Sequence, residues 1–322
     1  MRGQFVISLD FELHWGSRDA SPFLDHRDAI LNGRRAVEAL VKLFRARSIH
    51  ATWATVGILF ARTREEALRH APARRPAYVD ARLNPYDELL ASGEDETSDP
   101  FHFAGSLVDV IAQTPLQELA THTFSHYYCL EPGQSAEAFA ADLAAARSIG
   151  ERHGRVLSSL VFPRNQFSAA SLAVARDAGV TTFRGNPDAW CWQPGSGQQQ
   201  TAARRALRLY DAYALEQPRT QQVLRDPSGL FNVPASRFLR PYHPKLAAAD
   251  PLRLARIHSE LTAAARSGGL FHLWWHPNNF SSHLAQNLSF LERVLDHFEL
   301  MQRRYAMESM TMAEAAATSD RV

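Results

Sequence analysis

The sequence predicts an α/β fold in which parallel strands alternate with helices. Residues 5–9 form an apolar run that is typical of a buried strand, and residues 28–47 follow with apolar side chains at a helical period. Residues 49–56 are rich in β-branched and aromatic side chains and complete a strand–helix–strand unit. Further along the chain, strand-like runs again end in polar residues, which is where parallel α/β folds place their functional side chains.

The same alternation continues toward the C-terminus. Short apolar runs predict strands, and longer runs with a period near 3.6 predict helices. Ser135 is a suitable N-cap for the helix that follows it, and Gly154 a suitable stop. Further strands are expected at residues 117–121, 157–162, 180–183, 270–276 and 307–312, with short ones at 231–233 and 238–239, and further helices at 105–113, 135–153, 168–178, 251–266 and 285–304.

Two segments interrupt this rhythm. Residues 61–100 contain Pro72, Pro76 and Pro85 together with an acidic stretch, and we expect a partly helical insertion that either covers the surface or forms a lid. Residues 189–240 are expected to be irregular, with a flexible loop at 194–200. Size alone allows one barrel-like domain or two smaller ones, and we expect a single domain over residues 1–322.

Composition excludes several classes of protein. The chain has 322 residues and a formal net charge of +1, and its basic residues are dispersed, so no nucleic-acid partner is expected. No apolar run approaches the roughly 20 residues of a membrane span. An export signal is not recognisable, and two cysteines, Cys129 and Cys191, are too few to staple a chain of this size. A cytoplasmic location with free thiols is therefore expected.

The most informative stretch runs from Glu118 to His126. It places His122 and His126 four residues apart directly behind an apolar run, so both imidazoles can face one metal ion. With fourteen histidines in the chain, this pair alone is a weak signal. A catalytic divalent ion usually has about three protein ligands, and the acidic tip Asp10-Phe-Glu12 of the first strand offers the missing carboxylate.

Four segments taken together resemble the polysaccharide deacetylase family, the NodB-homology carbohydrate esterases. The resemblance covers most of the chain, and its motifs are strong in combination although each is weak alone. It implies a distorted parallel (β/α) barrel of about seven strands, with insertions covering the carboxyl-end face. The matching segments are Ser8-Leu-Asp-Phe-Glu12, Ala51-Thr-Trp-Ala-Thr-Val-Gly57, Glu118 through His126, and Leu273-Trp-Trp-His276.

The resemblance also implies a metal site and a base. Asp10 corresponds to the family's general base, and Glu12, His122 and His126 to its metal ligands, with Zn²⁺ the expected ion. Glu12 is a departure, because the family usually has aspartate there. The longer side chain either repositions the ion or serves by binding through both oxygens.

Other roles implied by the resemblance fall on later segments. Arg164, in the altered third motif Phe162-Pro-Arg-Asn-Gln166, is expected to orient Asp10, and a backbone N–H near Arg164 or Asn165 to stabilise the oxyanion. His276 is expected to protonate the leaving amine, since imidazole titrates near neutrality. Asp188-Ala-Trp190 stands where the family has an Asp-Trp element.

Aromatic residues near these strand tips suggest how a sugar is held. Trp190 and Tyr127 are the candidates for substrate contact, although aromatic residues at strand ends are at least as often part of the core. His14 and His272 are expected to have structural or peripheral roles.

The activity implied is a metal-dependent hydrolase that removes an N-acetyl or related acyl group from an amino sugar in polysaccharide or lipopolysaccharide biosynthesis. The substrate would be nucleotide-linked, lipid-linked or an oligosaccharide. Two alternatives stay open at this stage. One is an amidohydrolase acting on a non-sugar amide, and the other is a degenerate relative that binds sugar without catalysis.

Overall fold

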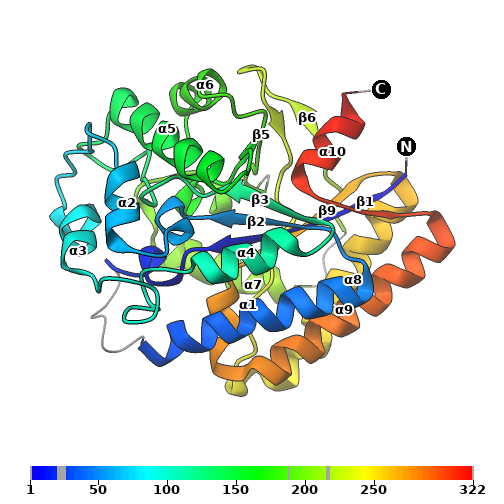
Figure 1. Cartoon of the computed structure of the whole chain (residues 1–322). Coiled ribbons are helices and arrows are strands. Elements are labelled where there is room, and N and C mark those ends of the chain that lie inside the picture. The colour runs from blue at the N-terminus through cyan, green and yellow to red at the C-terminus, as the bar shows by residue number, and fades with distance from the viewer. Residues whose placement is uncertain (1, 20–26, 188, 215–217, 321–322) are drawn as a thin grey trace.

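A central strand, β1, organises the molecule. The computed structural model describes residues 2–19, 27–187, 189–214 and 218–320. Strand β1 (Gln4–Phe11) is buried along its whole length, as its apolar sequence predicts. It lies between two parallel neighbours, β2 (Ala51–Thr55) and β9 (Leu270–Trp275). Because these strands are parallel, their carboxyl ends meet at one edge of the sheet (Figure 1).

The sheet continues from β2 and curls back toward β9. Parallel strands β3 (Gln117–Thr121), β4 (Ser159–Leu160) and β5 (Thr182–Phe183) follow β2 in that order. Next to β5 lies β7 (Phe231–Asn232), which β6 (Leu224–Arg225) flanks in the antiparallel direction.

One short segment connects the two sides of the curl. Beyond β7 the chain enters β8 (Arg237–Phe238), which pairs with β9. In the link between β7 and β8, the Val233 N–H donates to the Phe183 carbonyl at 2.9 Å. The Ser236 N–H donates to the His272 carbonyl at 2.8 Å. The curled, mostly parallel sheet confirms the predicted distorted (β/α) barrel.

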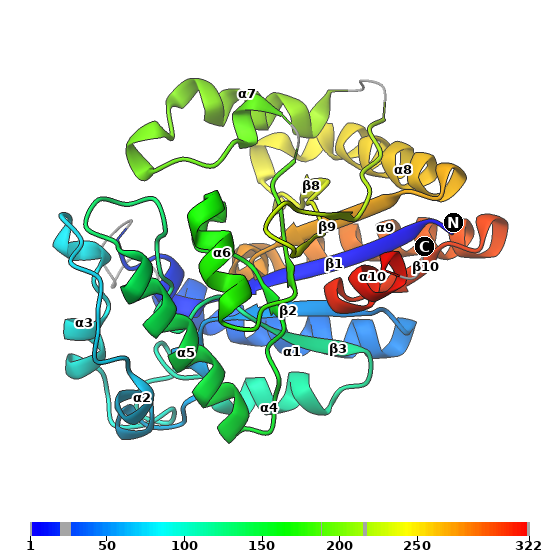
Figure 2. The same cartoon turned by 90° about the horizontal axis from the view of Figure 1, so that it is seen from above.

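The long helices lie around this sheet, as Figures 1 and 2 show. They lie where periodicity predicts them, within one or two residues at each end, and the predicted Ser135 cap accepts a hydrogen bond from the Ala138 N–H. These helices are α1 (Arg27–Arg47), α4 (Gly105–Gln113), α5 (Ala136–Arg152), α6 (Ala169–Asp177), α8 (Asp250–Ser267) and α9 (Leu284–Tyr305). The apolar faces of α1, α4, α8 and α9 join the main core with Phe5, Trp53 and Trp275, whereas α6 packs in a second core cluster around Phe162.

The C-terminal segment forms the expected strand, which a helix follows. Strand β10 (Glu308–Met310) pairs with the first half of β1, and helix α10 (Met312–Ser319) follows it. Met312, Ala315 and Ala316 bury one face of α10, and Thr311 begins the helix with a capping box. Short alanine-rich helices of this kind depend on tertiary packing more than on a clear sequence period.

The two irregular segments contain helices of their own. Residues 61–100 hold α2 (Arg64–His70) and α3 (Tyr86–Ala91), so this segment is partly helical as predicted. The segment at 189–240 holds a helix that the sequence did not predict, α7 (Ala202–Tyr213), which stands apart from the sheet in Figure 2. Of its residues Ala212 alone is buried, so this helix adds little to the core. Short 3-10 helices include η1 (Leu13–Gly16), η5 (Pro163–Asn165), η6 (Trp190–Trp192) and η9 (Pro277–His283).

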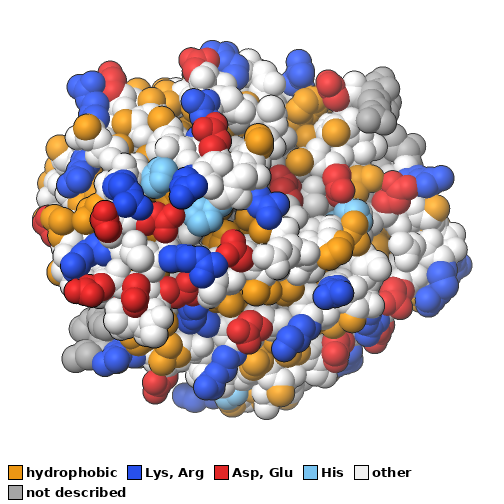
Figure 3. All heavy atoms as spheres, viewed as in Figure 1, with side chains coloured by type: hydrophobic (Ala, Val, Ile, Leu, Met, Phe, Trp, Pro, Cys, Tyr) orange, Lys and Arg blue, Asp and Glu red, His pale blue; other side chains and the backbone are white. Residues whose placement is uncertain are grey.

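The surface agrees with the near-neutral composition. On the face shown in Figure 3, acidic and basic side chains are interspersed. Among the described residues, no helix is both long and apolar enough to cross a bilayer.

Candidate metal centre

Glu12, His122 and His126 converge at the carboxyl edge of the sheet. Glu12 follows β1, and His122 follows β3 directly. The Nε2 atoms of His126 and His122 lie 3.0 Å and 3.3 Å from the same Glu12 oxygen, Oε2. Both imidazoles are buried, and the Glu12 side chain is 12% exposed. Two nitrogens and one carboxylate oxygen facing a common point form a set that suits a divalent ion.

Neighbouring groups hold both imidazoles with Nε2 toward that point. His122 Nδ1 lies 2.8 Å from the Val161 carbonyl, which can only accept, so in the neutral ring Nδ1 carries the proton and Nε2 keeps its lone pair. His126 Nδ1 lies 3.1 Å from the Tyr128 hydroxyl. Histidine ligands are usually oriented in this way through their second nitrogen. Within the described part of the chain, the buried His122 Nε2 makes no hydrogen bond, so this atom is able to coordinate an ion.

Electrostatics favour the ligand forms of these groups. Burial, the largest influence, lowers the pKa of His126 to about 4, so its ring is neutral at pH 7. Burial alone would raise the pKa of Glu12, but His276, His122 and His126 outweigh it and hold the pKa well below its usual range. A neutral imidazole beside an ionised carboxylate is the combination that binds a cation.

The backbone that carries His126 is strained and is held by a buried acid. His126 has a φ of 58°, a left-handed conformation that is uncommon for residues other than glycine. Asp142 on α5 accepts from the Phe124 N–H at 2.7 Å and from the Ser125 hydroxyl. Burial raises the pKa of Asp142 to about 6. Sequence reasoning missed this residue, although an aspartate three residues after Phe139, on the buried face of an alanine-rich helix, was an available signal.

A glycine makes room for the Glu12 side chain. A Cβ atom at Gly16 would lie 2.0 Å from the Glu12 carboxyl carbon. Any larger residue there would displace the carboxylate from the two histidines. Gly16 therefore accommodates the extra methylene that distinguishes Glu12 from the aspartate of the deacetylase motif.

The arginine that holds Asp10 is Arg184, and the expectation for Arg164 needs correction. Arg184 donates to both Asp10 oxygens, at 2.6 Å and 2.8 Å, from the residue directly after β5. Arg164 instead pairs with Asp19 and lies over the Tyr128 ring, at 4.5 Å from its centroid. Its backbone is left-handed, with a φ of 54°, so the side chain leaves the strand tip in a direction that the motif did not predict. The sequence did place Arg184 at a strand tip, which was the available signal.

Arg184 also sets the charge of Asp10. Burial would raise the pKa of Asp10, but Arg184, with smaller contributions from His122 and His276, outweighs it and the pKa is lowered. Two parallel N–H···O bonds fix the plane of the carboxylate as well as its charge.

His276 and Asn165 lie beside this pair. His276 Nε2 is 3.7 Å from Asp10 Oδ2 and 3.6 Å from Glu12 Oε1, and its side chain is 28% exposed toward the cavity described below. Asn165 Oδ1 accepts from Arg184 at 2.9 Å. His276 therefore lies beside Asp10, and Asn165 lies beside Arg184, the partner of Asp10.

The two predicted sugar contacts lie elsewhere. Tyr127 is buried in the core, with its hydroxyl 3.0 Å from the Ser135 carbonyl, because it packs against Phe139 on α5. Trp190 is 58% exposed and lies near Arg204, outside the residues that line the cavity. Asp188 of the proposed Asp-Trp element is outside the described residues.

A cavity of about 300 Å³ opens onto the cluster. Asp10, Glu12, His126 and His276 are among the residues that line it. The rest of its lining includes two tryptophans and three arginines, namely Trp192, Trp274, Arg164, Arg205 and Arg208. A larger cavity, of about 500 Å³, shares Trp192 but contains none of the clustered histidines.

Comparison with known proteins tests the fold. No family model matches the chain, and no curated protein matches by sequence. A crystal structure assigned as a polysaccharide deacetylase from Mycobacterium smegmatis is similar, with a TM-score of 0.62 and 13% identity over 99% of this chain and 91% of that one. The chain has the polysaccharide deacetylase fold. A protein with the same assignment from Pseudomonas aeruginosa PAO1 gives a TM-score of 0.51 and 13% identity, covering 99% of this chain and 90% of its own.

The same fold serves another chemistry. The α-amylase AmyC from Thermotoga maritima is similar at a TM-score of 0.56 and 14% identity, over 100% of this chain and 75% of that chain. Since a fold does not decide chemistry, the activity must be argued from the clustered residues.

Proposed function

We propose that this protein is a metal-dependent hydrolase that removes an N-acetyl group from an amino sugar. The observation that carries the proposal is the convergence of Glu12, His122 and His126, with Asp10 and His276 beside them on one cavity. A glycosidase relies on two carboxyl groups at its reacting centre, whereas two imidazoles that face one carboxylate oxygen form a donor set for a divalent ion. The histidine pair therefore favours the deacetylase chemistry over the amylase chemistry.

Glu12, His122 and His126 would hold the ion, and two nitrogens with one oxygen suit Zn²⁺. Bound there, a divalent ion supplies Lewis-acid chemistry that polarises an acetyl carbonyl and acidifies a water molecule. The fit rests on the His122 lone pair, which faces Glu12 without a hydrogen-bond partner in the described part of the chain.

Asp10 acts as the general base and His276 as the general acid. Arg184 keeps Asp10 ionised and aimed, so that a carboxylate oxygen is ready to accept the proton of the attacking water. His276 lies on the open side of Asp10 and delivers a proton to the departing amine. Free acetate and a free amino sugar are the products.

The cavity favours a substrate that carries negative charge. Arg164, Arg205 and Arg208 line the same cavity as His276, and guanidinium groups bind phosphate with paired hydrogen bonds. Trp192 and Trp274 offer aromatic faces for a sugar ring. An N-acetylhexosamine linked to a diphosphate, of the kind used in polysaccharide biosynthesis, combines both features.

The test is a substrate panel scored by acetate release and product mass, with Zn²⁺ supplied. We expect turnover of UDP-N-acetylglucosamine to exceed that of a neutral N-acetylglucosamine oligomer. Arg205→Ala with Arg208→Ala should raise KM for the charged substrate with little change in kcat. Turnover confined to non-sugar amides would replace the sugar assignment, and sugar binding without acetate release would replace the enzyme assignment.

A further inference from the structure

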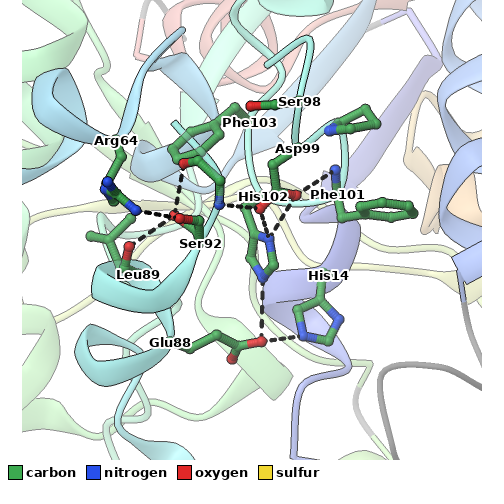
Figure 4. A network of polar contacts seen from close by, with 12 residues as sticks. His14, Arg64, Glu88, Leu89, Ser92, Ser98, Asp99, Phe101, His102 and Phe103 are labelled. Carbon is green, nitrogen blue, oxygen red and sulfur yellow. Dashed lines mark hydrogen bonds and ion pairs between the residues drawn. The ribbon is translucent and has the colours of Figure 1, made fainter. Parts of the chain in front are cut away.

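A second group of metal-binding side chains lies apart from the cavity. This second cluster consists of His14, Glu88 and His102, which come from three separate segments (Figure 4). His14 lies in η1, Glu88 in α3 of the insertion, and His102 in the turn before α4. His14 Nε2 is 2.6 Å and His102 Nε2 is 3.3 Å from the same Glu88 oxygen, Oε1. Two imidazoles therefore share one carboxylate oxygen, as in the first cluster.

The ring of His102 is oriented from behind. Its Nδ1 lies 2.9 Å and 2.8 Å from the two oxygens of Asp99, which leaves Nε2 directed at Glu88 (Figure 4). Asp99 is itself held by the backbone N–H groups of Gly93, at 2.8 Å, and Phe101, at 3.3 Å. A carboxylate behind a histidine, fixed by backbone donors, is the usual outer shell of a metal ligand.

Packing holds both imidazoles in place. His14 and His102 are buried, with ring centroids 5.0 Å apart and planes near perpendicular. Trp15 donates its indole N–H to the His102 carbonyl at 2.9 Å and lies edge-on to the imidazole. Glu88 is more accessible, with a side chain 32% exposed, so an ion has a route of entry beside it.

We propose that His14, Glu88 and His102 form a second site for a divalent cation of the zinc type, with Asp99 as the orienting group of His102. Ligand atoms about 2.0–2.1 Å from a tetrahedral ion lie roughly 3.3 Å from one another. His102 and Glu88 already have this separation, 3.3 Å. The 2.6 Å contact between His14 and Glu88 must widen, and α3 is a short helix whose carboxylate can move.

The site would join the insertion to the catalytic edge. His14 lies two residues beyond Glu12, whereas Glu88 belongs to the segment at 61–100. A bound ion would fasten α3 to η1 and so fix the backbone from which Glu12 projects. This second site does not depend on the proposed deacetylase activity.

The experiment is the zinc content of purified protein after equilibration with ZnCl₂ and removal of free metal. We expect about two zinc ions per chain in the wild type and about one in Glu88→Gln. Asp87→Asn, which changes the exposed neighbouring carboxylate of α3, is the matched control and should retain two. His126→Ala should bind one, and His126→Ala combined with Glu88→Gln should bind none.

A second readout separates binding from misfolding. Chelation should lower the Tm of His126→Ala, whose remaining zinc would occupy the second cluster, and should leave the Tm of the double variant unchanged. A further variant is His102→Gln. Equal zinc content in the wild type, Glu88→Gln and His102→Gln would overturn the proposal, and the second cluster would then be a network of ion pairs without a metal. If His126→Ala lost zinc while Glu88→Gln and His102→Gln kept the wild-type content, the result would support the first cluster and reject the second.

Discussion

The two histidine clusters have the same donor set but differ in what surrounds them. Glu12, His122 and His126 lie beside a cavity, with Asp10 and His276 at hand. The second cluster contributes no residue to that cavity. Catalytic zinc sites keep a position open for water or substrate, whereas structural sites are closed by the protein. The two clusters therefore show that the surroundings of a metal site, such as an adjoining cavity, distinguish a catalytic site from a structural one when the ligands are the same.

The largest expected effect separates the two clusters by activity. His126→Ala removes a ligand of the open cluster and should lower kcat/KM by on the order of 10³-fold or more. Glu88→Ala should keep turnover within about tenfold of the wild type, because it touches neither Asp10 nor His276. Acetate release under saturating zinc measures both, with His258→Ala on α8 as a control for a distant histidine. Comparable losses in both variants would mean that the clusters act as one unit.

The next effect concerns Arg184, which donates to both oxygens of Asp10 beside the first cluster. Arg184→Met leaves Asp10 buried without its cation, so the pKa of Asp10 should rise and the acidic limb of kcat/KM should move to higher pH. Loss of a buried ion-pair partner should also lower the free energy of unfolding by about 3–5 kcal/mol. A pH–rate profile and urea unfolding measure the two changes.

Arg164→Met is the matched control for that experiment. Arg164 lines the same cavity but pairs with Asp19, so its loss should change KM without moving the acidic limb. An equal shift of the limb in both arginine variants would contradict the assignment of Arg184 to Asp10.

A smaller effect tests how tightly the first cluster is packed. Gly16→Ala places a Cβ against the Glu12 carboxyl group and should weaken zinc binding by about 10–100-fold, as changes around metal ligands commonly do. Glu12→Asp in the same chain withdraws the carboxylate and should recover part of the affinity. Zinc titration against a chromophoric chelator measures both variants. If Gly16→Ala binds zinc with wild-type affinity, the close packing of residue 16 against the Glu12 carboxyl group does not affect metal binding.

The smallest effect is a pH dependence of stability that arises behind the first cluster. His272 is buried, and burial, with Arg184, lowers its pKa to about 3. Since the folded pKa lies below the unfolded value, this residue contributes stability above pH 6.5 that is lost as the pH falls toward 3. Between pH 6.5 and pH 5 the loss should be about 2 kcal/mol. Urea unfolding at several pH values should show this slope in the wild type and a shallower one in His272→Gln.

Much of the fold followed from local patterns. Apolar runs and helical periods predicted the bounds of β3 and α4 and the cap at Ser135, because burial and capping act over short stretches. Helix α7 and helix α10 escaped prediction, since the first buries little and the second depends on packing beside β1.

The candidate site divides in the same way. By itself the sequence determined that acids and imidazoles stand at strand tips, because parallel strands share a carboxyl edge. Tertiary structure alone decided that Arg184 rather than Arg164 holds Asp10, that Tyr127 is in the core, and that Glu88 meets His14. These pairings join residues far apart in the chain, and side-chain direction at a loop or a left-handed residue depends on packing that no local pattern records.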